Sequence, residues 1–283
     1  MENDGKSKYT IDSTRKSLRF LSQHANLNEP EQVRQFIARH ECTNGRKRNL
    51  STAYARYATY YGIAWQPPKY EPDPRQIRTP TKEKVDMLIA NSGRKMATKL
   101  RISMETGIRP VELCNLKVKD IDIEQRLIYP TTAKHGIART LKISLILQNM
   151  LIEYIARDKL KPDDKLFKTT ARGYSKMFRL SRNALAEKLQ DPTLKKIRLY
   201  DFRHFFATNL YHKTRDLLLV KQQLGHKNIE NTLIYTQLLN LEEDEWTCKT
   251  ATTPQESASL IEDGFEYVIG TFQDGGRQFR KRK

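Results

Sequence analysis

Apolar residues recur at helical spacing through the first 64 residues of the chain. Residues 13–25, 29–40 and 49–62 are each predicted to form a helix, because apolar side chains stand three or four positions apart, as Val33, Phe36 and Ile37 do. Four prolines then lie between residues 67 and 74, where they break helices and favour extended chain. The pattern predicts a helical domain at residues 1–64 and a proline-rich linker at residues 65–80.

A second domain begins where helical spacing returns after the linker. Thr81 and Glu83 are typical of a helix start. The same spacing predicts three further helices, at residues 94–105, 144–157 and 174–189. Short β-like runs predict a three-stranded sheet, at residues 118–123, 127–130 and 140–143. We therefore expect a fold that is mainly α with a small antiparallel β-sheet (α+β), and a second domain at residues 81–241.

The densest pattern lies at residues 198–239. On a helix, one arc of about 100° would collect a polar and basic set, namely Tyr200, Arg203, His204 and Ala207. The opposite side would collect the aromatic residues Phe202, Phe205 and Phe206. Gly225 is expected to end the next apolar helix just before His226. Beyond it, Leu233 and Leu238 are predicted to face a core, with Tyr235 between them.

The tail at residues 242–283 has a composition of its own and opens with four acidic residues. Thr253 is predicted to cap a helix that has proline in its first position and ends at Gly264. Residues 265–272 and 278–283 are predicted strands around an Asp-Gly-Gly turn, which makes a helix plus a β-hairpin. Three roles stay open for this tail: capping of the domain, packing on a neighbouring protomer, or a second contact with the partner that the rest of the chain binds.

Arginine, histidine and tyrosine are the candidate chemical groups of the second domain. Pro110 suits the first position of a helix, which places Arg109 at the mouth of that helix and Glu112 in its first turn. An arginine fork matches phosphate oxygens, a histidine can donate to another oxygen, and a tyrosine hydroxyl can serve as a covalent nucleophile. These groups suit attack on a phosphodiester, a reaction that they can carry out without a metal or a cofactor.

Composition narrows the class of partner. A formal net charge of +18 and a pI near 9.7 indicate that the partner is a polyanion. The positive charge is spread along the whole chain, which disfavours a helix that binds a membrane surface. The first ten residues have no apolar segment of the kind found in signal peptides, so we expect a cytoplasmic protein. Cys42, Cys114 and Cys248 lie far apart, which favours neither a disulfide framework nor a zinc site.

These motifs resemble the tyrosine recombinase and phage integrase family. Its first box, Thr-Gly-x-Arg-x-x-Glu-Leu, matches residues 106–113 at every fixed position. Its second box, His-x-x-Arg-His, is followed by Leu-Gly-His and by a nucleophilic Tyr nine residues after that last His, as in His226 and Tyr235. The sequence departs from the box at Tyr200, which stands where the family has His. This departure suggests an archaeal-type integrase.

The resemblance implies a two-domain architecture and a set of residue roles. A helical core-binding domain would close around DNA, and a DNA breaking and rejoining catalytic domain would carry the reaction. Arg109, Arg203 and His226 would hold the phosphate that Tyr235 attacks. Lys134 would protonate the leaving 5′ oxygen, with Arg139 and Lys142 as alternative candidates. Three residues would support the site, namely Glu112 by orienting the arginines, Tyr200 by supporting the phosphate geometrically, and His204 as a base or second-layer partner of the nucleophile.

Basic side chains elsewhere are candidate DNA contacts. In the first domain they are Arg46, Lys47, Arg48 and Arg56, which stand beside a tyrosine stripe that suits either a core or a base-reading surface. In the helix at residues 174–189, Arg179 and Arg182 are predicted on an outer basic face, with Met177, Leu180 and Leu185 on an inner apolar one.

The sequence as a whole predicts a site-specific DNA recombinase. Its expected partners are double-stranded DNA and further copies of the chain, as a tetramer by family analogy. Two alternatives stay open: a topoisomerase IB-like enzyme that nicks and closes DNA, and a DNA-binding regulator that does not catalyse.

Overall fold

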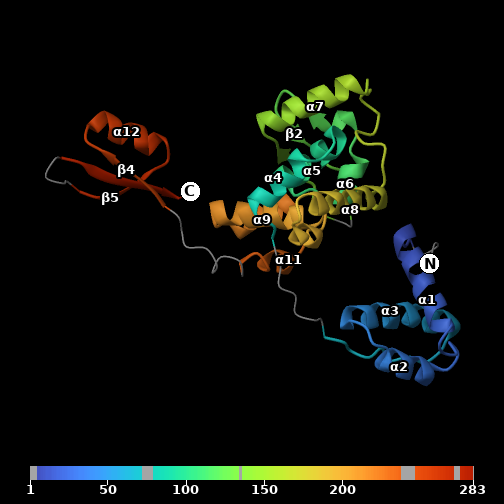
Figure 1. Cartoon of the computed structure of the whole chain (residues 1–283). Coiled ribbons are helices and arrows are strands. Elements are labelled where there is room, and N and C mark those ends of the chain that lie inside the picture. Colours follow the sequence, from blue (N-terminus) through green and yellow to red (C-terminus); the bar gives the residue numbers. More distant parts are fainter. Residues whose placement is uncertain (1–4, 72–78, 134–135, 237–245, 271–274, 283) are drawn as a thin grey trace. The chain divides into compact units, whose positions relative to one another are not determined.

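The computed structural model describes residues 5–71, 79–133, 136–236, 246–270 and 275–282 (Figure 1). The chain divides into two compact units, Met1–Gln76 and Ile77–Lys283. The division falls within the segment predicted as a linker.

The first unit is built from three helices, α1 (Lys8–Ser22), α2 (Pro30–Arg39) and α3 (Asn44–Tyr61). α1 and α3 begin five residues earlier than predicted, because Ser7 and Thr43 cap them with side-chain oxygens. Their core consists of Leu21, Val33, Ile37, Leu50, Tyr54 and Ala58. Trp65 and Tyr70 of the predicted linker also pack against this core. The start of that segment therefore belongs to the first unit.

Along the sequence of the second unit, helices precede and follow a small sheet. Before the sheet come α4 (Lys82–Ala90), α5 (Arg94–Thr106) and α6 (Pro110–Asn115). The sheet is antiparallel in the order β1-β2-β3, with strands Ile121–Asp122, Leu127–Ile128 and Leu141–Lys142. After it come α7 (Leu145–Arg157), α8 (Ala171–Lys188), α9 (Asp201–Thr214), α10 (Leu217–Leu224) and α11 (Glu230–Leu233). A 3₁₀ turn at Val118–Asp120 shortens the first predicted strand, and a second one at Pro192–Lys196 lies between α8 and α9.

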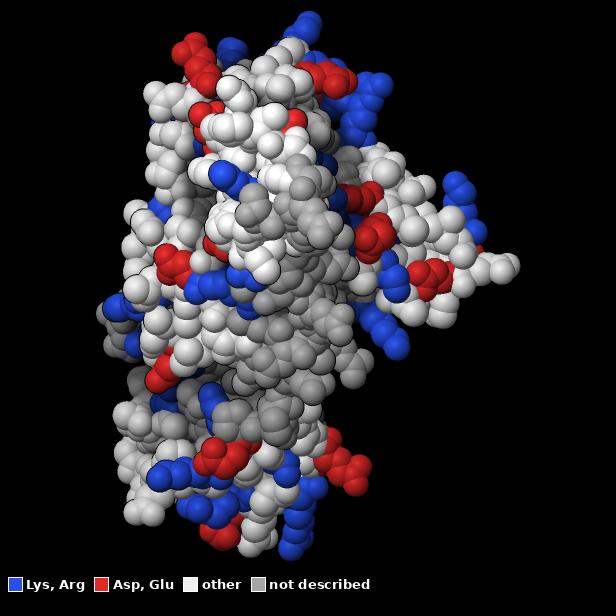
Figure 2. Space-filling model, turned by 90° about the vertical axis from the view of Figure 1, so that its left-hand side faces the viewer, with Lys and Arg blue, Asp and Glu red and all other residues white. Residues whose placement is uncertain are grey.

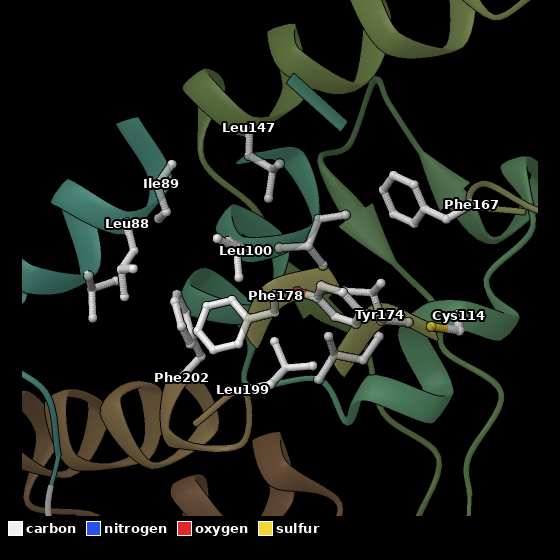
Figure 3. Packing of buried hydrophobic residues seen from close by; sticks show 14 of the residues in the cluster. Leu88, Ile89, Leu100, Cys114, Leu147, Phe167, Tyr174, Phe178, Leu199 and Phe202 are labelled. Carbon is white, nitrogen blue, oxygen red and sulfur yellow. The ribbon is translucent and has the colours of Figure 1, made fainter. Parts of the chain in front are cut away.

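The core of this unit surrounds α5, which packs against α4, α7 and α9. Figure 3 shows Leu100 of α5 among Leu147, Tyr174, Phe178 and Phe202, side chains that come from three other helices. The helix that carries Phe202 is thereby fixed against the helix that leads into Arg109. This packing positions the two arginine-bearing segments relative to each other.

Two predicted apolar faces are wrong in part, although Leu185 is buried as predicted. In α8 the buried positions are Tyr174, Phe178, Arg182 and Leu185, whereas Met177 and Leu180 are 57% and 51% exposed. The aromatic residues set the buried face of this helix, and positions 177 and 180 lie about 100° and about 160° away from Phe178 around the helix axis. Leu233 is also exposed, and Tyr235 is buried in its place. Leu238 lies outside the described residues.

The tail contains three strands where two were predicted. Its elements are β4 (Trp246–Ala251), α12 (Pro254–Glu262), β5 (Glu266–Ile269) and β6 (Arg277–Arg282). The sheet has the order β4-β6-β5, and a small core forms from Ala251, Leu260, Phe265 and Phe279. Thr253 caps α12 as the sequence predicts, and Glu256 completes a capping box with it. Asp274 of the predicted turn lies outside the described residues.

Candidate active site

Arg109 stands at the start of α6 because the chain turns sharply after α5. Gly107 ends α5 in the left-handed conformation, with φ +59°, and a Cβ there would lie 2.5 Å from the Phe206 ring. Pro110 follows in the first helical position. Glu112 accepts hydrogen bonds from Arg109 N at 3.1 Å and from Arg109 Nη1 at 2.8 Å. The helix start and the carboxylate together fix the direction of the guanidinium.

The Glu112 carboxylate is fully buried and has further partners. It accepts hydrogen bonds from Ala133 N at 3.1 Å and from Arg139 Nη2 at 2.6 Å. Burial alone would raise the pKa of Glu112, but the hydrogen bond and charge of Arg139, with smaller help from Ala133 N–H and Arg109, lower it. Glu112 is therefore an anion that joins α6 to the segment before β3.

Arg203 lies in the interior of the second unit and is 1% exposed. Its Nη1 donates to the Gly107 carbonyl at 2.6 Å and its Nη2 donates to the Leu224 carbonyl at 2.7 Å. Burial, and then the charge of Arg109, lower the pKa of Arg203 to about 10. The side chain thus remains a cation at neutral pH and links α9 to the two turns that carry Arg109 and His226.

His226 follows the turn at Gly225, which ends α10 with φ +64°. Arg109 Nη2 lies 3.4 Å from the Gly225 carbonyl oxygen, and His226 Nδ1 lies 2.9 Å from Thr232 Oγ1. Burial, followed by the charges of Arg203, Arg109 and Arg139, lowers the pKa of His226 to about 4. In the free protein His226 is therefore neutral at pH 7.

Tyr235 is 2% exposed, and its hydroxyl lies 3.1 Å from His204 Nδ1. Burial raises the pKa of Tyr235 to about 12, although the charge of Arg203 opposes the rise. Burial also lowers the pKa of His204, which favours the neutral ring that can accept a proton. A tyrosine hydroxyl and a potential base are therefore already hydrogen-bonded.

Tyr200 precedes α9 instead of lying within it, and its side chain is 44% exposed. Its ring meets the His204 ring edge-on, with centroids 5.2 Å apart and an interplanar angle of 71°. Tyr200 thus contacts His204, and His204 in turn contacts Tyr235, the candidate nucleophile.

The structure brings most of the predicted site residues together through direct contacts or shared partners. They are Arg109, Glu112, Tyr200, Arg203, His204, His226 and Tyr235. Lys134 lies outside the described residues. Sequence reasoning missed Thr232, whose position six residues after His226 was the only signal for it. It also placed Arg139 among candidate acids and did not anticipate its ion pair with Glu112.

The candidate DNA contacts of the first unit mostly have partners within the chain. Arg46 Nη1 donates to Ser17 Oγ at 3.3 Å, Lys47 Nζ to the Ala38 carbonyl at 2.7 Å, and Arg56 Nη1 to Thr14 Oγ1 at 2.6 Å. These hydrogen bonds hold the three basic side chains against the surface of the helices. Arg48 is exposed.

The tyrosine stripe of α3 divides between core and surface. Tyr54 is buried, whereas Tyr60 and Tyr61 are 81% and 60% exposed. Tyr60, Tyr61 and Arg56 line a hollow of about 510 Å³ against α1. The stripe therefore has a buried member in the core and exposed members at the surface, and a role of the exposed members in reading bases stays a prediction.

In the second unit, Arg179 is exposed, but the outer position predicted for Arg182 is wrong. Arg182 is 9% exposed and its Nη1 donates to the Ile197 carbonyl. It therefore braces α8 against the following turn. Figure 2 shows Lys and Arg side chains scattered over one face with acidic side chains between them.

In the part of the chain that the structure describes, His, Cys, Asp and Glu form no group of three or more that could hold a metal ion. Likewise, none of the described helices has the length and apolar character to cross a membrane.

Residues 80–242, more than half of the chain, match the model of the phage integrase family. A probable integrase/recombinase of Methanocaldococcus jannaschii is 32% identical over 143 residues, which are 48% of this chain and 43% of that protein. Tyrosine recombinase XerA of Pyrococcus furiosus is 30% identical over 170 residues, 56% of this chain and 52% of that protein. The aligned part thus spans about half the length of these two relatives. XerA of Thermococcus kodakarensis is 26% identical over 93% of both chains.

Solved structures share the fold. The Tn1549 transposon integrase in complex with circular intermediate DNA has a TM-score of 0.69 and 18% identity, over 93% of this chain and 96% of that chain. A lambda integrase dimer bound to a core site has a TM-score of 0.64 and 13% identity, over 85% and 93%. At these identities the likeness concerns the arrangement of the backbone.

Proposed function

The chain belongs to the phage integrase family, and from this membership we propose that it is a site-specific DNA recombinase. It cuts and rejoins double-stranded DNA through a covalent 3′-phosphotyrosyl intermediate. The observation that carries the proposal is the hydrogen bond from Tyr235 to His204, beside the buried Arg203. A nucleophile, a proton acceptor and a phosphate-binding cation are combined there.

The arginines are the groups that bind the phosphate in this proposal. Glu112 pairs with Arg109 and Arg139, whereas Arg203 donates to two backbone carbonyls. Among the described residues, no other carboxylate forms an ion pair with these three arginines. The excess of positive charge in a buried site favours an anion. Charge on the nonbridging oxygens grows toward the transition state, so these cations and His226 stabilise that state most.

Proton transfer divides between the two sides of the phosphate. His204 takes the proton of Tyr235 as the phenol oxygen attacks phosphorus and the bond to the 5′ oxygen breaks. Lys134 then gives a proton to that departing oxygen. The N–H of Ala133, one residue before Lys134 in the sequence, donates to Glu112, which supports placing this part of the chain at the site. The Tyr200 ring supports His204 through its edge-on contact.

The remaining parts of the proposal concern the domains and the partners. Residues 1–64 form a core-binding domain, residues 65–80 a linker, residues 81–241 the catalytic domain, and residues 242–283 an appendage. Arg48 and Arg179 are exposed candidates for phosphate contact. Exchange between two duplexes requires a homo-oligomer, a tetramer by family analogy, which acts on DNA in the cytoplasm.

Covalent trapping tests the proposal. The full chain is incubated, in the presence of excess chelator, with nicked suicide duplexes made from the genomic DNA that flanks its gene. We expect a protein–DNA adduct with the wild type, and its loss in Tyr235→Phe, because phenylalanine lacks the attacking oxygen. Tyr211→Phe, on α9, is the matched control and should form the adduct at the wild-type rate.

Three outcomes decide between the alternatives. A chelator-resistant adduct that survives in Tyr235→Phe would refute the nucleophile. An adduct with nicking and closing, but no exchange between two duplexes, would favour the topoisomerase-like enzyme. Salt-sensitive DNA binding without any adduct on the fragment that binds most tightly would favour the non-catalytic regulator.

A further inference from the structure

Arg139 is buried within the candidate active site and does not reach its exposed surface. Its side chain is 1% exposed, and its Nη2 donates to Glu112 Oε2 at 2.6 Å. The other oxygen of the same carboxylate accepts Arg109 Nη1. Glu112 therefore stands between the two guanidinium groups, and the direction of one arginine depends on the position of the other.

The second contact of Arg139 is with the turn that carries His226. A Cβ built on Gly225 would lie 2.8 Å from Arg139 Nη1 and 2.9 Å from the Ile137 carbonyl oxygen. The guanidinium thus lies directly against the backbone of Gly225. The left-handed conformation of Gly225 and this close approach explain why the turn has no side chain there.

The rest of the Arg139 guanidinium has no bond that would explain its burial. Its Nε and Nη1 are buried and lack a hydrogen-bond partner among the described residues. A buried donor without a partner is costly, so a residue kept for stability alone would be better as an apolar side chain. An arginine at this place is better explained by what its charge and fork impose on its neighbours.

We propose that Arg139 is a positioning residue that fixes Glu112 and the Gly225 turn, and through them aligns Arg109 and His226 on the scissile phosphate. This inference rests on the proposed recombinase function. It also separates Arg139 from the general-acid role, because its guanidinium is buried and its Nη2 already donates to Glu112.

The first test combines single and double variants in single-turnover cleavage of the trapped suicide duplex. Arg139→Met should slow cleavage by about 100-fold, a loss typical of small misalignment, while DNA affinity stays within about 2-fold. Arg139→Lys keeps the charge but loses the fork, and should recover only part of the rate. Arg101→Met, which removes an arginine–glutamate pair elsewhere in the same unit, is the matched control and should cleave at the wild-type rate.

Non-additivity identifies the route by which Arg139 acts. If it acts through Arg109 and His226, Arg139→Met should slow an Arg109→Ala, His226→Ala protein by less than about 3-fold, because the aligned groups are already absent. A full 100-fold loss in that background would overturn the inference. So would a single Arg139→Met variant that cleaves at the wild-type rate.

A measurement on the free protein separates this inference from the proposed function. The NMR signals of the His226 ring are assigned with His226→Gln and followed in the other variants. Arg139→Met should shift them, whereas Arg101→Met should leave them in place. A shift in a protein that never forms an adduct would support the positioning and refute the recombinase. Unchanged His226 signals in Arg139→Met would overturn the positioning.

Discussion

At the scale of the residue, the pair His204 and Tyr235 carries the sharpest prediction. His204→Gln keeps a hydrogen-bonding side chain but cannot take a proton, so cleavage should slow by about 10²–10⁴-fold. Because burial lowers the pKa of His204, its neutral form persists below the ordinary value of about 6.5. With subsaturating DNA, the wild-type rate should therefore stay level through pH 6.5 and fall only at lower pH. The acid-side decline should be absent from His204→Gln.

Tyr200 provides the control for that pair. Tyr200→Phe retains the ring edge that meets His204, and we expect a rate within about 3-fold of the wild type, whereas Tyr200→Ala should slow cleavage more. A Tyr200→Phe variant as slow as His204→Gln would assign the proton transfer to Tyr200 and contradict the role given to His204. The sequence indicated Tyr200 and His204 as site residues. Their edge-on contact depends on the position of Tyr200 before α9, which helical periodicity does not reveal.

At the scale of the element, the Gly225 turn can be tested by one added methyl group. Gly225→Ala places a Cβ at 2.8 Å from Arg139 Nη1 in a left-handed residue, so it combines backbone strain with a clash. Gly264→Ala, with φ +82° and no neighbour closer than 3.7 Å, introduces strain alone. Strain of this kind costs about 1–2 kcal/mol. In thermal denaturation Gly225→Ala should lose clearly more stability than Gly264→Ala, and equal losses would show that the turn has room.

Elements were predictable where a local signal defined them and were missed where pairing was distant. Thr81, Ser144 and Thr253 cap helices at the predicted positions, because a cap bonds to backbone three residues away. β4 was missed, since it depends on pairing such as Thr250 with Gln278, which local pattern does not encode. The exposed Met177 likewise reflects a buried face chosen by tertiary packing around Phe178.

At the scale of the whole molecule, the family and the two-box chemistry were accessible from sequence because the motifs are short and local. The hydrogen-bond network that joins the two boxes was not accessible from the sequence. Glu112, Ala133 and Arg139 meet across two elements, and no spacing in the chain predicts that meeting. The net charge of +18 indicated a polyanionic partner, but it did not separate the exposed Arg179 from the buried Arg182.

The same buried network should make the stability of the second unit depend on pH. The pKa of His226 is about 4 in the folded protein and about 6.5 when unfolded, so the unfolded chain binds the proton first as pH falls. Stability should decline between pH 6.5 and pH 4, by at most about 3 kcal/mol from this residue. Glu112, whose pKa is lowered, adds a further loss of stability once the pH falls below the ordinary pKa range of a glutamate.

Chemical denaturation at pH 7, 5.5 and 4.5 measures the decline in stability, which His226→Gln should reduce above pH 4.5. An unchanged slope in His226→Gln would mean that His226 is already protonated in the folded protein, and that the arginines do not exclude a second charge from the site.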